Sequence, residues 1–216
     1  MPSRAMVVVG GGASTRFGRD KLMIEIDGRT LLEHTIDAVI DHVDLCVVVC
    51  RQEVGRVILE RRPGVVVAAG GTTRTRSEIA GLSAIDREVD LIGIHDAARP
   101  LISGGVIEDL FDTALSEGGA LPLLEYRRIL VDRETLAPVP GVHGAQTPQV
   151  FRAADLMAAY SRAREDGFEG HDTVEVMQAY SNVRIVGIPG DPGNLKVTYP
   201  EDLDEVRSRL SDASRT

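Results

Sequence analysis

The chain has 216 residues, of which 43% are hydrophobic and 26% charged, as in an ordinary soluble globular domain. Its formal net charge of −9 argues against a nucleic-acid binder, but it does not exclude a protein that binds a nucleotide at a local positive site. No apolar run approaches the roughly 20 residues of a membrane span. The N-terminal run 5–9 is too short for a signal peptide, so we expect a cytoplasmic protein.

Short apolar runs alternate with amphipathic segments along the chain. The run 45–50 (LCVVVC) is apolar at every position, which is typical of a strand covered on both faces of a sheet. The predicted strands are Ala5–Val9, Leu45–Cys50, Gly64–Ala68, Leu91–His95, Gly119–Leu124 and Asn182–Ile188.

Helices are predicted between these strands. In the segment 30–41, for example, Leu31, Ile36 and Val39 fall on one helical stripe. The predicted helices are Thr30–Asp41, Val54–Arg61, Arg76–Asp86, Val106–Glu117, Ala153–Asp166 and Pro200–Leu210. The alternation of strands and helices predicts one α/β domain over residues 1–216, with three layers and a mostly parallel sheet.

The two cysteines, Cys46 and Cys50, lie four positions apart on one predicted strand. They would point to the same face of the sheet about 13 Å apart, which is too far for a disulfide. We predict that both are buried core residues.

The segment 122–142 interrupts the alternation because it contains no amphipathic helix. Its sequence indicates two short strands around an Asp-Arg-Glu turn, followed by a return rich in proline and glycine. Such a β-arm would project from the domain, and an isolated hairpin is rarely stable in water. We therefore expect the arm to pack on a second copy of the chain in a homodimer.

A glycine-rich loop follows the first predicted strand. Residues 10–12 are glycines, and Arg16 and Lys21 add positive charge shortly after them. Small residues let backbone N–H groups approach a phosphate, so the loop is a candidate anion site; a tight turn with surface cations is the alternative. The loop lacks the ending of a P-loop, and Thr15 stands at the third glycine position of a dinucleotide-binding loop.

Residues 95–100 (HDAARP) stand at the end of an apolar predicted strand. Ligands of open α/β sheets bind beyond the carboxyl ends of the strands, so Asp96 is well placed to hold Mg²⁺ shared with substrate phosphates. Arg99 would bind a phosphate through its guanidinium group, and His95 is predicted to be structural. The alternative for Asp96 is a helix cap before a turn marked by proline.

Two further segments carry polar groups beside predicted helix starts. Residues 70–77 (GGTTRTRS) combine glycines, hydroxyls and two arginines, so they are candidates for binding a base or a phosphate. A glycine turn with a capping hydroxyl is the alternative. Lys196 is predicted to end a strand just before Pro200 starts a helix, which would make a phosphate-binding corner; the alternative is a surface lysine.

Together with 147–151 (TPQVF) and 194–203 (NLKVTYPEDL), these motifs extend over nearly the whole chain. In this order they resemble the 2-C-methyl-D-erythritol 4-phosphate cytidylyltransferase family. The resemblance implies a Rossmann-like nucleotidyltransferase fold, CTP as the nucleotide, Mg²⁺ as the cofactor and a homodimer with interlocking β-arms. The implied reaction is in-line attack of the acceptor phosphate on the α-phosphorus of CTP, with release of pyrophosphate.

The resemblance also implies roles for individual residues. Arg16, Lys21 and Lys196 would be catalytic, because they would stabilise negative charge on the phosphates, and Asp96 would bind Mg²⁺. Arg99 and Lys196 would bind the acceptor phosphate. The residues that hold CTP would be Gly10, Gly11, Gly12, Ser14, Gly71, Thr72, Ser77 and Ala97.

The acceptor half of the expected site departs from the family pattern. Val139 stands where the family carries an arginine that reaches across the dimer, and Tyr126 lies where the arm often has Asp-Thr. His171 replaces the threonine of a Thr-Asp pair. In place of the missing arginine, the acceptor phosphate would be bound by Arg127, Arg128 or His171.

Three functions are consistent with these features. The first is a 2-C-methyl-D-erythritol 4-phosphate cytidylyltransferase. The second is a cytidylyltransferase for another polyol phosphate such as ribitol 5-phosphate, although the HDAARP motif, rather than HDSVRP, favours the first. The third is a non-catalytic nucleotide-binding protein, against which the retention of Arg16, Lys21, Asp96 and Lys196 argues.

Overall fold

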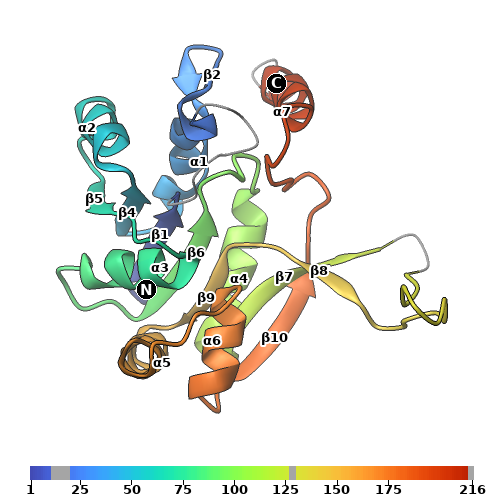
Figure 1. Cartoon of the computed structure of the whole chain (residues 1–216). Helices are drawn as coiled ribbons and strands as arrows, with labels where there is room; N and C mark the ends of the chain where they lie inside the picture. The colour runs from blue at the N-terminus through green and yellow to red at the C-terminus, as the bar shows by residue number, and fades with distance from the viewer. Residues whose placement is uncertain (11–19, 127–129, 214–216) are drawn as a thin grey trace.

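An eight-stranded sheet runs through the middle of the protein, with helices on both faces (Figure 1). The computed structural model describes residues 1–10, 20–126 and 130–213. The strand order is β10-β7-β9-β6-β1-β4-β5, and β8 pairs with β7. The strands of the sheet are β1 (Arg4–Val9), β4 (Leu45–Cys50), β5 (Val66–Ala69), β6 (Leu91–Asp96), β7 (Gly118–Glu125), β8 (His143–Ala145), β9 (Gln149–Arg152) and β10 (Arg184–Pro189).

Most neighbouring strands are parallel, whereas β9 is antiparallel to both β6 and β7. The order reverses at β1, because β4 and β5 extend the sheet to one side and β6 lies on the other. The register pairs Val9, the last residue of β1, with Asp96, the last residue of β6. Ligand sites of open α/β sheets lie beyond the strand ends at such a switch point.

The helices divide between two hydrophobic clusters, one on each face of the sheet. Alternate residues of β1 enter different clusters: Met6 and Val8 enter the first, and Ala5 and Val7 enter the second. The first cluster includes α1 (Leu31–Val39), α2 (Gln52–Arg61), α4 (Gly104–Glu117) and α7 (Asp202–Ala213), and the second includes α3 (Arg74–Ser83), α5 (Ala153–Asp166) and α6 (Thr173–Tyr180). These are the three layers that the sequence predicts.

Helix α3 lies very close to the centre of the sheet. A Cβ atom at Gly81 would stand 2.3 Å from Val7 Cγ1 and 2.7 Å from Val49 Cγ2, so this approach requires glycine. The close packing brings the first turn of α3 beside the carboxyl ends of β1 and β6 (Figure 1).

Short elements connect β1 to α1. A 3-10 helix, η2 (Lys21–Met23), is followed by an antiparallel pair, β2 (Glu25–Ile26) and β3 (Arg29–Thr30). After α1 comes a second 3-10 helix, η3 (Ile40–His42). None of the helices in the described residues is long and apolar enough to span a membrane.

The predicted strands and helices are confirmed, with shifts of a few residues at their ends. Cys46 and Cys50 are free and buried, as expected, and burial raises the pKa of the Cys46 thiol to about 12. Strand β9 and helix α6 were not predicted. The prediction that Lys196 ends a strand is wrong: β10 stops at Pro189, and Lys196 lies in the connection to α7, which begins at Asp202 rather than Pro200.

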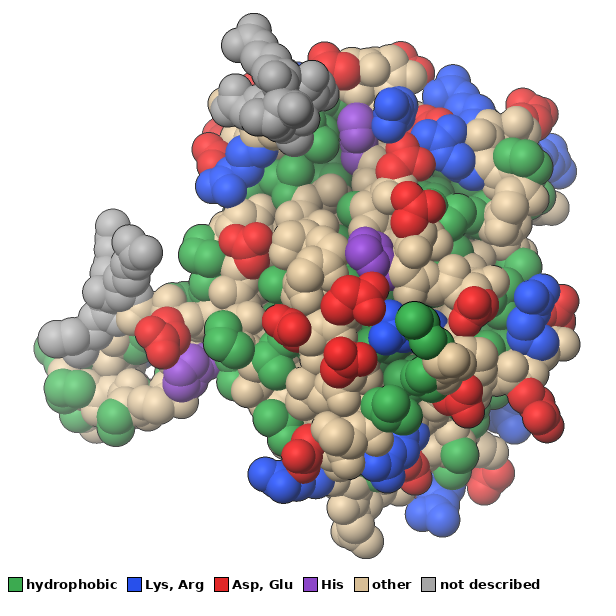
Figure 2. All heavy atoms as spheres, turned by 180° about the vertical axis from the view of Figure 1, so that it is seen from behind, with side chains coloured by type: hydrophobic (Ala, Val, Ile, Leu, Met, Phe, Trp, Pro, Cys, Tyr) green, Lys and Arg blue, Asp and Glu red, His purple; other side chains and the backbone are tan. Residues whose placement is uncertain are grey.

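The predicted β-arm is confirmed as a projection from the body of the protein (Figures 1 and 2). It leaves the sheet after β7 and returns through β8, and a bridge pairs Val131 with Pro138. The Asp132 carboxylate closes the turn by accepting from the backbone N–H groups of Glu134 and Thr135. Several large hydrophobic side chains of the arm are exposed, namely Tyr126, Val131, Leu136, Val139 and Val142.

Candidate active site

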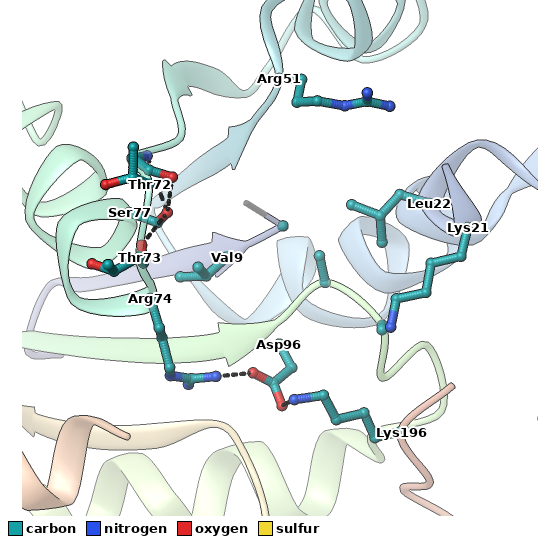
Figure 3. Close-up of a pocket in the computed structure, with 14 residues that line it drawn as sticks. Val9, Lys21, Leu22, Arg51, Thr72, Thr73, Arg74, Ser77, Asp96 and Lys196 are labelled. Carbon is teal, nitrogen blue, oxygen red and sulfur yellow. Dashed lines mark hydrogen bonds and ion pairs between the residues drawn. The ribbon is translucent and has the colours of Figure 1, made fainter. Parts of the chain in front are cut away.

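A cleft of about 630 Å³ opens beyond the carboxyl ends of β1 and β6 (Figure 3). Its described lining combines cations, hydroxyls and glycines with one carboxylate, that of Asp96. The chain contains two lysines, Lys21 and Lys196, and both line this cleft. The remaining described lining residues are Val9, Gly10, Leu22, Arg51, Gly71, Thr72, Thr73, Arg74, Ser77, Ala97 and Ala98.

One wall of the cleft is formed by the end of β1 and by η2. The Gly10 N–H donates to Val49 O at 2.7 Å, and a Cβ at Gly10 would stand 2.6 Å from Leu22 Cδ1 and 3.1 Å from Val49 O, so a larger residue would require Leu22 to move. Asp20 caps η2 by accepting from the Leu22 N–H. The Nζ atom of the adjacent Lys21 donates to Val197 O at 2.7 Å.

The opposite wall is the start of α3. Thr73 caps this helix by accepting from the Arg76 N–H, and the Ser77 hydroxyl donates to Thr73 O at 2.8 Å. The Gly71 N–H donates to Ser77 Oγ at 3.1 Å, which holds the glycine turn against the helix. The positive end of the α3 dipole therefore faces the cleft from the side where Thr72, Thr73 and Ser77 cluster in Figure 3.

Asp96 is the centre of a group of three cations. Arg74 Nη1 lies 2.6 Å from Asp96 Oδ1, and Lys196 Nζ lies 2.9 Å from Oδ2. Figure 3 shows these two cations approaching the carboxylate from opposite sides. Arg99 Nε completes the group at 3.3 Å from Oδ2. Asp96 is therefore a hub that orients three cations.

The charge of Asp96 is strongly stabilised. Burial alone would raise the pKa of its carboxyl group, but Arg74, Lys196 and Arg99 outweigh burial and hold that pKa well below the ordinary value. The carboxylate is therefore ionised at neutral pH. The three cations around Asp96 outnumber the carboxylates that pair with them, and this excess of positive charge suits an anionic ligand.

Hydrogen bonds join this hub to distant segments of the chain. The Asp96 N–H donates to Thr147 Oγ1 at 3.0 Å, and Asn194 Nδ2 donates to Thr147 O at 2.9 Å. Arg99 Nη1 donates to Asn194 O at 2.7 Å. The motifs around 96, 147 and 194 are thus assembled at one end of the sheet, which positions Lys196 beside Asp96.

His95 is a structural residue, as the sequence predicts. It is fully buried, and its ring bonds Arg99 O through Nε2 and Thr147 Oγ1 through Nδ1, each at 3.1 Å. Because Arg99 O can only accept, Nε2 carries the proton of a neutral ring, and Nδ1 then accepts from the Thr147 hydroxyl. Burial lowers the pKa of His95 to about 4.

This pKa predicts an acid-sensitive fold. Between pH 6.5 and about 4 the unfolded chain binds a proton at His95 that the folded chain refuses, so the free energy of unfolding should fall as the pH falls through this window. The loss should be about 3 kcal/mol, at about 1.4 kcal/mol per pKa unit. Urea unfolding at pH 7 and pH 4.5 should show a clearly smaller decrease in the free energy of unfolding for His95→Asn than for the wild type. An equal decrease in both proteins would contradict this assignment.

The cleft gathers most of the described residues that the sequence analysis selected, namely Gly10, Lys21, Gly71, Thr72, Ser77, Asp96, Ala97 and Lys196. Arg99 lies behind Asp96 rather than in the described lining. His171 lies at the start of α6 with its side chain 96% exposed and paired with Glu175, so the structure does not bring it into this cleft. Gly11, Gly12, Ser14, Arg16, Arg127 and Arg128 lie outside the described residues.

Two cations of the cleft, Arg74 and Arg51, were not predicted as site residues from the sequence. Arg74 entered the sequence analysis only as part of a motif, although it contacts Asp96 directly. Arg51 follows β4 and pairs with Asp20 at 2.5 Å. Arg51 could have been predicted as a cleft residue because it lies just beyond the carboxyl end of a buried parallel strand.

The fold and the cleft define a class of protein. A doubly covered, mostly parallel sheet holds a cationic cleft at its switch point, with a helix N-terminus on one wall and a carboxylate at the centre. This is the architecture of a Rossmann-like protein that binds a phosphorylated nucleotide.

Comparisons with known proteins identify the family. The model of the family described as 2-C-methyl-D-erythritol 4-phosphate cytidylyltransferase matches residues 4–211. A protein of that name from Thermobifida fusca is 35% identical over 236 residues, which cover 97% of this chain and 94% of the relative. The chain therefore belongs to the 2-C-methyl-D-erythritol 4-phosphate cytidylyltransferase family.

Two further matches describe the extent of the likeness. A crystal structure of a 2-C-methyl-D-erythritol 4-phosphate cytidylyltransferase from Thermus thermophilus is 27% identical with a TM-score of 0.82, and the match covers 98% of this chain and 100% of that one. A bifunctional enzyme IspD/IspF from Rhizorhabdus wittichii is 32% identical over the whole of this chain, which spans 58% of that protein's length.

Proposed function

We propose that the chain transfers CMP from CTP to 2-C-methyl-D-erythritol 4-phosphate, giving 4-diphosphocytidyl-2-C-methyl-D-erythritol and pyrophosphate in the synthesis of isoprenoid precursors. The observation that carries this proposal is the cationic cleft around Asp96 in a chain of this family. A phosphate oxygen of the acceptor forms a bond to the α-phosphorus of CTP. The bond from that phosphorus to the bridging oxygen breaks, and pyrophosphate leaves with the electron pair.

The described residues suit this reaction because both reactants are polyanions. Catalysis then consists of positioning the reactants and neutralising their charge, and it needs no protein nucleophile. Lys21 and Lys196 supply two cations to the lining of the cleft. The N-terminus of α3, with Gly71, Thr72 and Ser77, provides the polar wall that we assign to the cytidine.

We propose Mg²⁺ as the cofactor, with Asp96 as a ligand. No group of three or more His, Cys, Asp or Glu residues that could hold a metal ion occurs in the part of the chain that the structure describes. Proteins often hold Mg²⁺ through one or two carboxylates together with substrate phosphates, so a single aspartate fits an ion that binds with the triphosphate. When bound, the ion would neutralise charge on the phosphates.

Pyrophosphate release with CTP and Mg²⁺ tests the proposal, using a panel of phosphorylated polyols. Turnover is expected with 2-C-methyl-D-erythritol 4-phosphate. Turnover with ribitol 5-phosphate alone would favour the second candidate, which Val139 and the exposed position of His171 support. Absence of turnover with every acceptor would contradict the proposal and favour a nucleotide-binding protein.

We also propose that the chain forms a homodimer through the β-arm, and that it acts in the cytoplasm. The arm projects from the body and exposes five large hydrophobic side chains, which a partner subunit would cover. Light scattering should then give twice the chain mass of 23.3 kDa.

Val131→Asp should raise the dissociation constant of this dimer by at least about 10-fold, because it places a charge among the hydrophobic side chains of the arm that we propose a partner subunit covers. Leu59→Asp is the matched control, since Leu59 is a similarly exposed hydrophobic residue on α2, away from the arm. A monomeric wild type, or equal effects of the two variants, would contradict the proposed interface.

A further inference from the structure

Arg74 lies between two carboxylates that come from different parts of the fold. Its Nη1 donates to Asp96 Oδ1 at 2.6 Å, and its Nε donates to Glu78 Oε1 at 2.8 Å. The third guanidinium nitrogen, Nη2, is buried without a hydrogen-bond partner among the described residues. The position of the guanidinium group thus depends on these two carboxylates.

Glu78 is itself held from two other helices. Its side chain is fully buried inside the second cluster, one helical turn beyond Arg74 on α3. The Tyr160 hydroxyl on α5 donates to Glu78 Oε2 at 2.5 Å, and the Thr173 hydroxyl on α6 donates to Oε1 at 3.2 Å. Burial is the largest influence and leaves the pKa of the Glu78 carboxyl group above its ordinary value, although Arg74 and the two hydroxyls act in the opposite direction. These three partners are all donors, as an ionised acceptor requires.

A continuous chain of contacts therefore runs from α5 and α6 through Glu78 and Arg74 to Asp96 in the cleft. Glu78 does not line the cleft, and it contacts none of the residues assigned to the substrates. The Glu78 carboxylate pairs with Arg74 on the side away from the cleft. Arg74 in turn contacts one oxygen of Asp96, and Lys196 contacts the other oxygen.

We propose that Glu78 is a positioning residue for the reaction: it fixes Arg74, which fixes the Asp96 carboxylate and with it the Lys196 ammonium group. The inference rests on the proposed function, because it assigns these groups to the reacting phosphates. Without the charge of Glu78, Arg74 is drawn toward Asp96, and the carboxylate turns away from the position that Lys196 requires. A displacement of about 1 Å at a catalytic group can lower a rate by about 100-fold.

The first test is Glu78→Gln, which keeps the size of the side chain and removes its charge. We expect kcat to fall about 10- to 100-fold while the KM for CTP changes less than about twofold, because positioning is lost rather than binding. Glu33→Gln is the matched control: Glu33 is also a buried glutamate paired with an arginine, Arg61, but it has no contact with the cleft. This control should lower the melting temperature and leave kcat unchanged.

A double-mutant cycle separates positioning from a general loss of stability. In an Arg74→Met background, Glu78→Gln should change kcat less than about twofold, because its effect passes through Arg74. An equal fall of kcat in both backgrounds, or a lower melting temperature with unchanged kcat, would overturn the proposal. If Glu78→Gln does not fold, Tyr160→Phe is expected to lower kcat several-fold, with Tyr180→Phe, which removes a surface bond to Asp166, as its control.

The inference and the proposed function can fail separately. A wild type without turnover contradicts the proposed function, and the inference is then tested by crystal structures of the wild type and Glu78→Gln. We expect the Arg74 guanidinium and the Asp96 carboxylate to shift by about 1 Å or more while the backbone is unchanged. Identical positions of both groups would overturn the inference.

Discussion

Lys21→Ala is expected to lower kcat by a factor of about 10²–10³ and to raise the KM for CTP far less. Losing one group that stabilises charge in the transition state typically costs that much. Lys21 is presented by η2, whose cap Asp20 is fixed by Arg51, and its ammonium group donates to Val197 O beside Lys196. A cation held in this position can stabilise the negative charge that develops on the pyrophosphate group as it leaves.

Steady-state kinetics of pyrophosphate release measures this effect. Arg87→Ala is the matched control, because Arg87 is an exposed cation that precedes β6, at the end of the sheet away from the cleft. The control should retain wild-type kcat. An unchanged kcat for Lys21→Ala, or a change confined to KM, would show that Lys21 only binds the nucleotide.

Asp96→Asn is expected to lower both activity and stability. Arg74, Arg99 and Lys196 would lose the carboxylate that holds them together, and three adjacent cations would repel one another. Breaking a buried ion pair by removing one partner typically destabilises a protein by about 3–5 kcal/mol. Activity should fall at least about 100-fold, since the cations that face the phosphates lose their positions.

Urea unfolding at pH 7 measures the stability of this variant. Added pyrophosphate should restore part of the lost stability, because an anion can replace the missing charge, and it should stabilise the variant more than the wild type. Asp90→Asn is the control, because it also removes a carboxylate that accepts hydrogen bonds, in this case from Ser3, but at the other end of β6. Wild-type stability of Asp96→Asn would contradict the description of Asp96 as a hub.

Much of the fold could be predicted because its central strands are buried on both faces. The runs at β1 and β4 are apolar at nearly every position, and β6 begins with the run LIGI, which distinguishes these strands from surface strands. Strand β9 was missed because its four residues follow a proline and overlap a motif. Helix α6 is short, but the Asp172 side chain accepts from the Glu175 N–H, and this cap spacing was a usable signal.

The site was predicted only as far as it follows from strand ends. Asp96 ends β6, Gly10 follows β1 and Gly71 lies two residues after β5, so their proximity follows from the parallel order of these strands. The pairing of Arg74 with Asp96 depends on how α3 packs on β1, which spacing along the chain does not encode. Arg74 and Glu78, four residues apart, read equally well as an exposed pair on a helix surface.

The most direct test of the proposed reaction is a single-turnover experiment with CTP labelled at the α-phosphorus, Mg²⁺ and 2-C-methyl-D-erythritol 4-phosphate, with an excess of the protein. If the chain joins the acceptor phosphate to the CMP group, all of the label should pass into a diphosphate that also contains the methylerythritol carbon skeleton. Label that stays in CTP, or that appears only as free CMP, would contradict the proposed transfer.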